Sequence, residues 1–108
     1  TFINNGDTDV PLLIKIYGPC TNPKLLNATT GEYIRLNYIL RDSDVVEIST
    51  ENNNKYVLLN GTNIFNLIDL NTVFFKLTMG ENEVKFTADQ GQESAKLEIK
   101  WREQFVTV

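Results

Sequence analysis

Short runs in which apolar and polar residues alternate are the feature that most constrains what this chain can fold into. The clearest run covers residues 15–37, where the alternation stops at Gly18-Pro19 and then resumes. In an extended strand, successive side chains point to opposite faces, so a period of two places one set of side chains on a single buried face. Gly and Pro at the interruption are typical of a tight turn. The pattern predicts half-buried β-strands joined by short turns.

The same signal recurs along the rest of the chain. Strands are expected at residues 32–40, 55–60, 74–79, 83–88 and 95–101, and around Val46 and Ile48. Turns are expected at residues 29–31, 52–54 and 60–62, and a hairpin at residues 89–92 is expected to join the last two strands. Residues 64–70 lose strict alternation, which predicts a helical turn or a wide connection between sheets. The side chains expected to face the core are Val10, Leu12, Ile14, Ile16, Ile34, Leu36, Tyr38, Leu40, Val46, Ile48, Val84, Phe86, Ala88, Ala95, Leu97 and Ile99.

The spacing of the turns indicates the fold class. Strands that recur about every 8–12 residues, with Gly or Asn turns between them, are typical of an antiparallel β-sandwich or barrel. A chain of 108 residues is the size of one domain and can bury a core without disulfides. We therefore predict a single all-β domain over residues 1–108. The chain opens on Thr1 rather than Met, and residues 1–3 already resemble a strand, so we expect a piece of a longer polypeptide.

Charge and cysteine content disfavour several kinds of partner. The formal net charge is -4, and the sequence pI is about 4.7. Such a surface repels phosphate backbones and anionic bilayers, so neither nucleic acid nor a membrane is an expected partner. Cys20 is the single cysteine and has no cationic neighbour in sequence that would lower its thiol pKa. We expect a packed cysteine rather than a reactive one.

Catalytic chemistry has little support in the sequence. The chain contains no histidine, which removes the commonest general base and the commonest zinc ligand. Asp42 with Asp44, or Glu81 with Glu83, could form a carboxylate pair for catalysis, and Asp7 with Asp9, or Asp42 with Asp44, could bind calcium. All three pairs are better explained as solvated turn acids, and neither calcium candidate resembles a known ligand loop. We expect no catalytic residues, no cofactor and no metal.

Exposed aromatic side chains are the candidates for binding. Tyr17, Tyr33 and Tyr56 fall on the polar faces of their strands, where they could contact a partner protein or a glycan. Exposed tyrosine is also common on sheets that have no such role. Trp101 shares the parity of Leu97 and Ile99, so we expect its indole to pack at the rim of the core rather than to stack on a sugar.

Four blocks of sequence resemble the carboxy-terminal part of the distal tail proteins of long-tailed bacteriophages and prophages. No block is decisive alone, but the set covers nearly the whole chain in order. The final IKWR from Ile99 also resembles the closing strand of that family. The four blocks read IKIYGPCTNP from Ile14, TGEYI from Thr30, LNGTNIF from Leu59 and GENEVKFTA from Gly80.

The resemblance implies a fold and a role. In that family the amino-terminal domain forms a hexameric ring that continues the tail tube, and the carboxy-terminal domain is a β-sandwich of galectin-like, jelly-roll or carbohydrate-module-like form. The whole protein joins the tail tube to the host-recognition apparatus, a tail fibre or receptor-binding protein. The implied location is the virion tail tip, or the bacterial cytoplasm when a prophage is expressed. Without the ring domain, this chain is expected to be a monomer or a weak oligomer.

Two other classes of function remain open at this stage. A carbohydrate-binding module that contacts cell-wall glycans would use the tyrosines on the polar faces, and burial of Trp101 would weaken that alternative. An enzyme would need paired carboxylates in a deep cleft, and the missing histidine makes it the least favoured class.

Overall fold

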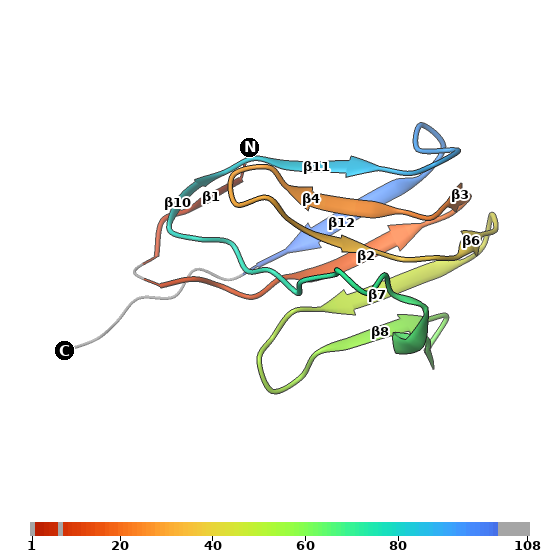
Figure 1. Ribbon diagram of the computed structural model, residues 1–108, viewed down its shortest axis with the longest axis horizontal. Helices are drawn as coiled ribbons and strands as arrows, with labels where there is room; N and C mark the ends of the chain where they lie inside the picture. Colours follow the sequence, from red (N-terminus) through yellow and green to blue (C-terminus); the bar gives the residue numbers. More distant parts are fainter. Residues whose placement is uncertain (1, 7, 102–108) are drawn as a thin grey trace.

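The computed structural model of the protein describes residues 2–6 and 8–101, and its regular structure is almost entirely β-strand (Figure 1). The single helical element described is a short 3₁₀ turn, so none of these residues belongs to a helix long and apolar enough to cross a bilayer. The elements are β1 (Phe2–Asn4), β2 (Leu13–Tyr17), β3 (Cys20–Thr21), β4 (Lys24–Asn27), β5 (Glu32–Arg35), β6 (Ile39–Leu40), β7 (Val45–Ser49), β8 (Tyr56–Leu59), β9 (Thr62–Asn63), η1 (Phe65–Leu67), β10 (Gly80–Asn82), β11 (Val84–Thr87) and β12 (Lys96–Lys100).

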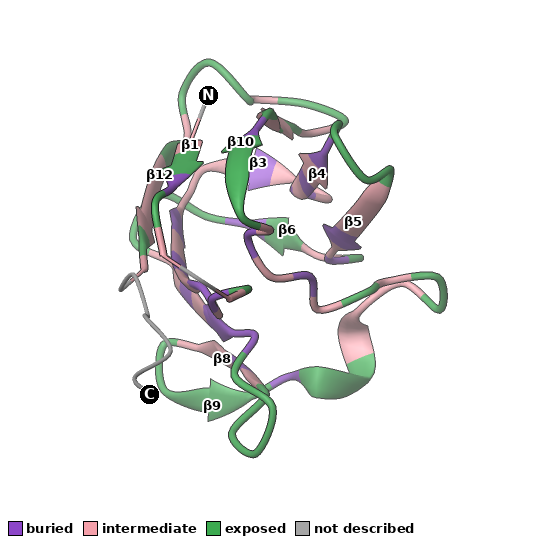
Figure 2. Ribbon diagram, turned by 90° about the vertical axis from the view of Figure 1, so that its left-hand side faces the viewer, coloured by how far each residue is buried: buried purple, intermediate pink, exposed green. Residues whose placement is uncertain are grey.

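Two antiparallel sheets pack face to face. The five-stranded sheet has the order β12-β2-β7-β8-β9, and the three-stranded sheet has the order β11-β4-β5. Two short pairs, β1 with β10 and β3 with β6, accompany them. Figure 2 looks along the molecule and shows the buried residues lining the space between the two layers. This arrangement confirms the predicted all-β sandwich.

The core lies between the inner faces of the two sheets. In the five-stranded sheet, Ile14 is the register partner of both Ile48 and Ile99, so branched side chains lie in a row across three strands. In the three-stranded sheet, Leu25 and Ile34 are register partners and are almost fully buried. All four predicted core positions from Val10 to Ile16 are buried, as are Ile34, Leu36, Leu40, Val46 and Ile48. The remaining predicted core residues are partly buried and pack against this cluster.

Local turns formed where glycine and asparagine predicted them. Asn60 and Gly61 both have positive φ, 49° and 86°, which turns β8 directly into β9. The turn at residues 29–31 joins β4 to β5, and the asparagine-rich loop at residues 52–54 joins β7 to β8. The non-alternating stretch at residues 64–70 contains η1.

Three predictions about strands were wrong. Residues 32–40 do not form one regular strand, because β5 ends at Arg35 and β6 begins at Ile39, with only two backbone hydrogen bonds to residues 22 and 23, Leu36 N–H to Pro23 and Asn22 N–H to Tyr38, between them. Opposite this break, Pro23 has no N–H to donate, and Asn22 has a φ of 50°. The register shifts by one residue between the Lys24–Arg35 pair and the Thr21–Ile39 pair, which marks a bulge.

Residues 74–79 also do not form a strand. Leu77 makes an isolated bridge to Val10, with N–O distances of 2.9 and 3.0 Å. Phe75 and Leu77 are buried as their alternation suggests. The segment leaves the edge of β5 after Val73 and reaches Val10, just ahead of β2, so it crosses from one sheet to the other.

The predicted hairpin at residues 89–92 was wrong as well. β11 pairs with β4 in the three-stranded sheet, whereas β12 pairs with β2 in the five-stranded sheet. Residues 89–92 therefore connect the two layers. A turn signal in the sequence shows that the chain reverses, but it does not show which strand each arm will join.

Candidate functional site

The three candidate tyrosines do not converge on one surface. Tyr17 and Tyr56 lie on the outer face of the five-stranded sheet, near opposite ends of it, since Tyr17 is opposite Val45 and Tyr56 is opposite Ser49 on the same strand β7. Tyr33 lies on β5, on the outer face of the other sheet. A single glycan or partner surface built from all three residues is therefore excluded by the topology.

The Tyr56 hydroxyl is hydrogen-bonded to a neighbouring carboxylate. Its hydroxyl donates to Glu47 Oε2 at 2.6 Å, and this hydrogen bond, with some burial, raises the pKa of Tyr56 to about 12. Lys15 Nζ lies 3.9 Å from the other carboxylate oxygen of Glu47. The Tyr56 ring borders a hollow of about 560 Å³ that Trp101 also borders. Residues 102–108, which follow Trp101, are outside the described part of the chain, and so is Arg102 of the resemblance.

Trp101 packs at the rim of the core, as its parity predicted. Its ring stacks on Phe2 with a centroid distance of 5.1 Å, and the side chain is only partly buried. Phe2 and Trp101 come from opposite ends of the described chain. This contact gives Trp101 a packing role.

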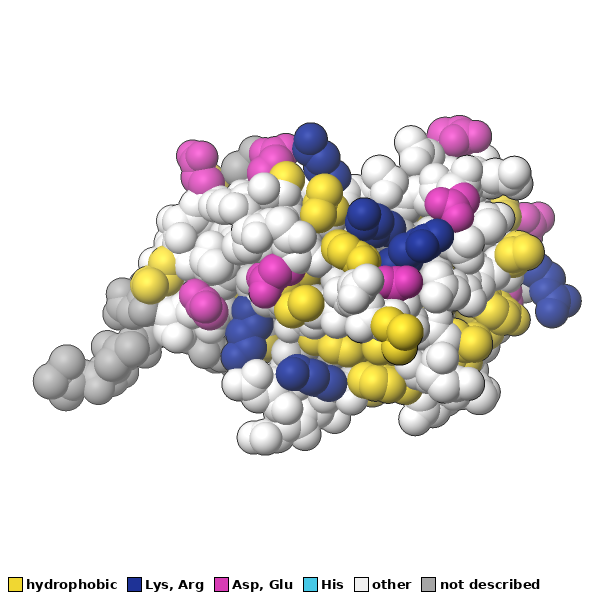
Figure 3. Space-filling view, in the orientation of Figure 1, with side chains coloured by type: hydrophobic (Ala, Val, Ile, Leu, Met, Phe, Trp, Pro, Cys, Tyr) yellow, Lys and Arg dark blue, Asp and Glu magenta, His cyan; other side chains and the backbone are white. Residues whose placement is uncertain are grey.

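The outer face of the three-stranded sheet carries a different set of side chains. Lys24 is the register partner of Arg35 on β5 and of Thr87 on β11, so these three form one row across the sheet. Leu26 is the register partner of Tyr33 and of Lys85, which form the neighbouring row. This face is toward the reader in Figure 3, where Lys and Arg side chains gather beside acidic ones.

Tyr33 is held on this face by two contacts. Lys24 Nζ lies 4.4 Å from the centroid of the Tyr33 ring, a cation–π contact. The Tyr33 hydroxyl donates to Asp69 Oδ2 at 3.1 Å, and the same oxygen accepts from the Asn71 backbone N–H at 3.1 Å. Asp69 comes from residues 67–73, which run along the free edge of β5 through two backbone hydrogen bonds of 2.8 Å, with a third of the same length to Asn37 just beyond the strand.

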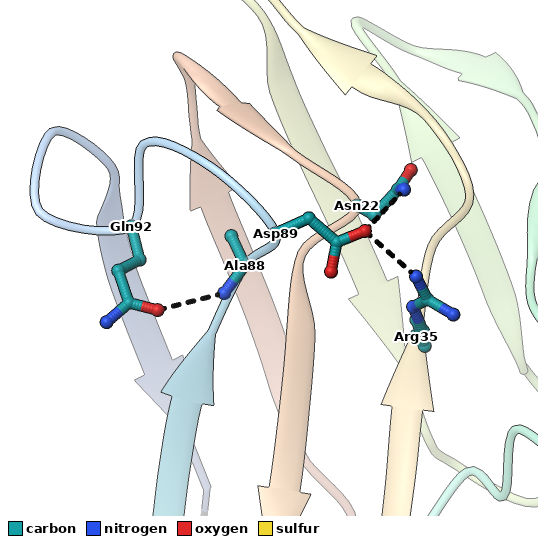
Figure 4. Close-up of polar contacts among 5 residues, drawn as sticks. All are labelled: Asn22, Arg35, Ala88, Asp89 and Gln92. Carbon is teal, nitrogen blue, oxygen red and sulfur yellow. Dashed lines mark hydrogen bonds and ion pairs between the residues drawn. The ribbon is translucent and has the colours of Figure 1, made fainter.

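Arg35 and Asp89 form the other part of the arrangement (Figure 4). Arg35 Nη2 lies 3.1 Å from Asp89 Oδ2, and Asn22 Nδ2 donates to the same oxygen at 2.9 Å. The Asn22 hydrogen bond and the nearby guanidinium lower the pKa of Asp89 below its ordinary value. In the same loop, Gln92 Oε1 accepts from the Ala88 backbone N–H at 3.2 Å.

These side chains enclose a polar hollow of about 560 Å³, which we call the sheet-face hollow. It is lined by Lys24, Tyr33, Arg35, Asp69, Asn71, Thr87 and Asp89. Of the predicted site residues, only Tyr33 lies here. The alternation in the sequence predicted that positions 33 and 35 lie on the polar face of their strand. Nothing in the nearby sequence indicated that Asp69 or Asp89 would contact them.

The remaining candidates for chemistry have structural roles. Asp44 accepts from the Arg41 backbone N–H at 2.8 Å and from Asn60 Nδ2 at 3.0 Å, and these bonds lower its pKa, so it is a turn acid as predicted. Asp7, of the pair with Asp9, lies outside the described residues. No group of three potential metal ligands occurs within residues 2–6 and 8–101. Cys20 is buried, and burial raises its thiol pKa, which confirms the packed cysteine.

An exposed apolar segment lies beside the sheet-face hollow, at residues 65–74. Phe65 stacks on Phe74 with a centroid distance of 5.4 Å. Leu70 is 100% exposed, and Phe65 and Val73 are more than 40% exposed. Isolated exposed apolar side chains are ordinary, but several within ten residues are characteristic of a contact surface.

Comparisons with known proteins agree with the resemblance seen in the sequence. A family model described as "Siphovirus-type tail component, C-terminal domain" matches residues 5–105. No curated protein and no solved structure matches the chain significantly. The match covers most of the sandwich, including the tyrosines, the sheet-face hollow and the exposed apolar segment. The chain therefore belongs to the siphovirus-type tail component family, of which it is a carboxy-terminal domain.

Proposed function

We propose that this domain is a structural element of the distal tail hub of a long-tailed bacteriophage or prophage. In this proposal it is one part of a longer tail protein whose other domain forms a hexameric ring on the tail tube. The sandwich, of galectin-like or jelly-roll form, projects from that ring and contacts a tail fibre or receptor-binding protein. It acts by binding alone, without catalysis, in the virion tail tip and, before assembly, in the cytoplasm of a bacterium that expresses the prophage.

Family membership is the observation that carries the proposal. A tail component must bind other tail proteins, and a sandwich is a rigid platform whose loops and edges can do so. Six copies around a ring would make weak individual contacts firm through multivalency. On its own, the domain would then be a monomer or a weak oligomer.

The exposed apolar segment at residues 65–74 is the surface that we assign to this contact. Leu70 is fully exposed, so replacing it should not affect folding. If Leu70 is buried against another tail protein, Leu70→Asp would remove apolar contact area and bury an unpaired charge at that interface.

The test is tail assembly by phage or prophage that carries Leu70→Asp in the tail protein gene. We expect complete tails, counted by negative-stain electron microscopy, to fall at least tenfold. The matched control is Met79→Asp, which places the same charge on another exposed apolar residue, directly ahead of β10 and outside residues 65–74. Equal tail yields for the two variants would contradict this contact.

A second candidate function is carbohydrate binding, which would help the tail adsorb to the cell wall. The observation that favours it is the sheet-face hollow, where Tyr33 lies among polar side chains that can hydrogen-bond to hydroxyl groups. A screen of host cell-wall glycans against this chain and its Tyr33→Ala variant tests it. If the unaltered chain and Tyr17→Ala bind a glycan and Tyr33→Ala does not, the result would support a sugar site on this face. If the unaltered chain binds no glycan, carbohydrate binding is excluded.

A further inference from the structure

The charges in the sheet-face hollow suggest what kind of ligand it would take. We infer that the hollow binds a saccharide bearing one anionic group, a carboxylate or a phosphate, between Lys24 and Arg35. This inference rests on the second candidate function, carbohydrate binding, and specifies its ligand class. The hollow shares Asp69 and Asn71 with residues 65–74 but does not include Leu70, on which the test of the tail-protein contact depends.

Two cations lie directly opposite each other across neighbouring strands. Lys24 and Arg35 are register partners in the β4–β5 pair, and their side chains share the outer face. Like charges in this position destabilise a sheet. The chain as a whole has a net charge of -4, so a cationic pair is a local departure from its surface. An anion placed between the two side chains would remove the repulsion.

Lys24 has no carboxylate partner among the described residues. None of the ion pairs of residues 2–6 and 8–101 includes it. Its ammonium group lies over the Tyr33 ring instead. Cation–π contact leaves an exposed ammonium free to donate hydrogen bonds to a ligand.

Among the described residues, Arg35 forms its one ion pair with an exposed carboxylate, that of Asp89. The Asp89 side chain is 56% exposed and its Oδ2 is shared between Arg35 and Asn22. A guanidinium carries five N–H donors, so one contact with Asp89 leaves others for an incoming anion. The ion pair with Asp89 therefore orients the Arg35 guanidinium toward the hollow and leaves N–H donors for a ligand.

The rest of the lining suits sugar hydroxyl groups. Asp69 and Asp89 can accept hydrogen bonds, Asn71 can donate and accept, and Thr87 can do both. Because Lys24 covers one face of the Tyr33 ring, that face is closed to a pyranose ring. Recognition would therefore come mainly from ion pairing and hydrogen bonds rather than from stacking.

The same features disfavour two other ligands. A protein segment would require an apolar centre, and Tyr33 supplies the only aromatic or aliphatic side chain among the residues of this lining. A polyphosphate chain carries more negative charges than Lys24 and Arg35 can pair with in a hollow that also contains Asp69 and Asp89. A sugar with a single anionic group places its charge between the cations and its hydroxyl groups at the carboxylates.

The test is a titration of the ¹⁵N-labelled 108-residue chain followed by amide chemical shifts. The probes are glucuronate, glucose 1-phosphate, neutral maltotriose and a triglutamate peptide. We expect shifts around residues 24, 33, 35 and 87 with one or both anionic sugars, and at least tenfold weaker binding of maltotriose and triglutamate. The responding sugar distinguishes a carboxylate source from a phosphate source.

Two substitutions at Lys24 test whether ligand binding requires its positive charge. Lys24→Gln should weaken binding of the anionic sugar about tenfold, the scale of one charge-assisted hydrogen bond, and Lys24→Arg should restore it. Lys15→Gln, on the opposite sheet and paired with Glu47, is the matched control and should change nothing.

The outcomes that would overturn the inference are also distinct. Maltotriose binding that matches the anionic sugars and ignores Lys24→Gln would refute the anion site but keep carbohydrate binding. Equal or tighter binding of triglutamate would assign the hollow to an acidic peptide. No shift with any sugar would overturn both the inference and the carbohydrate function on which it rests.

Discussion

Single buried amides hold the irregular parts of this fold in place. Asn82 is fully buried, and its Oδ1 accepts from the backbone N–H and the hydroxyl of Thr78 at 3.0 and 2.9 Å. Its Nδ2 donates to the carbonyl groups of Thr78 and Gly80 at 2.8 and 3.1 Å. One side chain thus closes the turn between the crossing segment and β10, where backbone pairing is absent.

Removing that amide should be costly. Asn82→Ala removes four hydrogen bonds from partly buried groups of Thr78 and Gly80 and leaves a cavity at a fully buried position, so we expect the free energy of unfolding in urea to fall by about 2–4 kcal/mol. Asn53→Ala, in the exposed loop between β7 and β8, is the matched control and should change it by less than about 0.5 kcal/mol. A loss at Asn82 no larger than at Asn53 would show that the turn does not depend on the amide.

Tyr56 gives a pH dependence that can be assigned to one hydrogen bond. Folding raises its pKa from 10.0 to about 12, chiefly through the bond to Glu47. The protonated hydroxyl is the form that the fold favours, so its contribution to stability is fully present below pH 10 and is lost as the pH rises toward 12. The stability difference between the unaltered chain and Tyr56→Phe should therefore shrink over that interval.

Ultraviolet titration of the tyrosines checks the assignment. One of the four tyrosines should ionise near pH 12, and Tyr56→Phe should remove that transition while Tyr17→Phe leaves it in place. If the transition survives in Tyr56→Phe, the raised pKa belongs to another group.

At the scale of elements, the inner faces of the strands were predictable and their partners were not. Alternation is a local property, so residues such as Ile14, Val46 and Ile48 could be assigned to the core from the sequence. The choice of partner depends on contacts distant in sequence. The wrong hairpin at residues 89–92 and the broken strand at residues 32–40 both follow from this, because β11 and β12 join different sheets and Pro23 interrupts a ladder from the opposite side.

The candidate site shows the same division. Tyr33 was predicted because its strand alternates, but its neighbours come from β4, from residues 67–73 and from the loop after β11. Asp89 is 54 positions from Arg35 in the sequence. A single sequence carries no signal for such a pair, so the hollow could not be assembled before the fold was known.

The edge of the three-stranded sheet depends on side chains as well as on its backbone. Thr72 Oγ1 accepts from the Arg35 N–H at 3.1 Å and donates to the Arg35 carbonyl at 3.2 Å. Through these bonds it holds residues 67–73 against β5 and so positions Asp69 beside Tyr33.

Thr72→Val should loosen this edge without unfolding the domain. We expect the amide protons of Asp69 and Val73, which donate to Arg35 and Tyr33, to exchange about tenfold faster with solvent. Global stability should fall by no more than about 1.5 kcal/mol, the scale of ordinary hydrogen bonds. Asn71→Ala is the control for a change in the same segment. If amide exchange is unchanged in Thr72→Val, the backbone hydrogen bonds alone hold residues 67–73 against β5.

At the scale of the whole molecule, the fold class and the family followed from the sequence, and the surfaces proposed for binding follow from the fold. The sandwich presents the exposed apolar residues 65–74 and the sheet-face hollow on adjoining parts of its surface, since Asp69 and Asn71 belong to both. A domain arranged in this way could contact a tail protein with one surface and a sugar with the next. Both proposed roles require that the domain lie at the end of the tail.

Location in the virion therefore tests the central proposal most directly. Antibodies raised against this chain, with gold-labelled secondary antibodies, would be applied to tails of the phage or prophage that encodes it and examined by negative-stain electron microscopy. We predict gold at the tail end farthest from the head. Gold along the tube, at the head, or absent from particles whose lysate contains the protein would contradict the hub proposal.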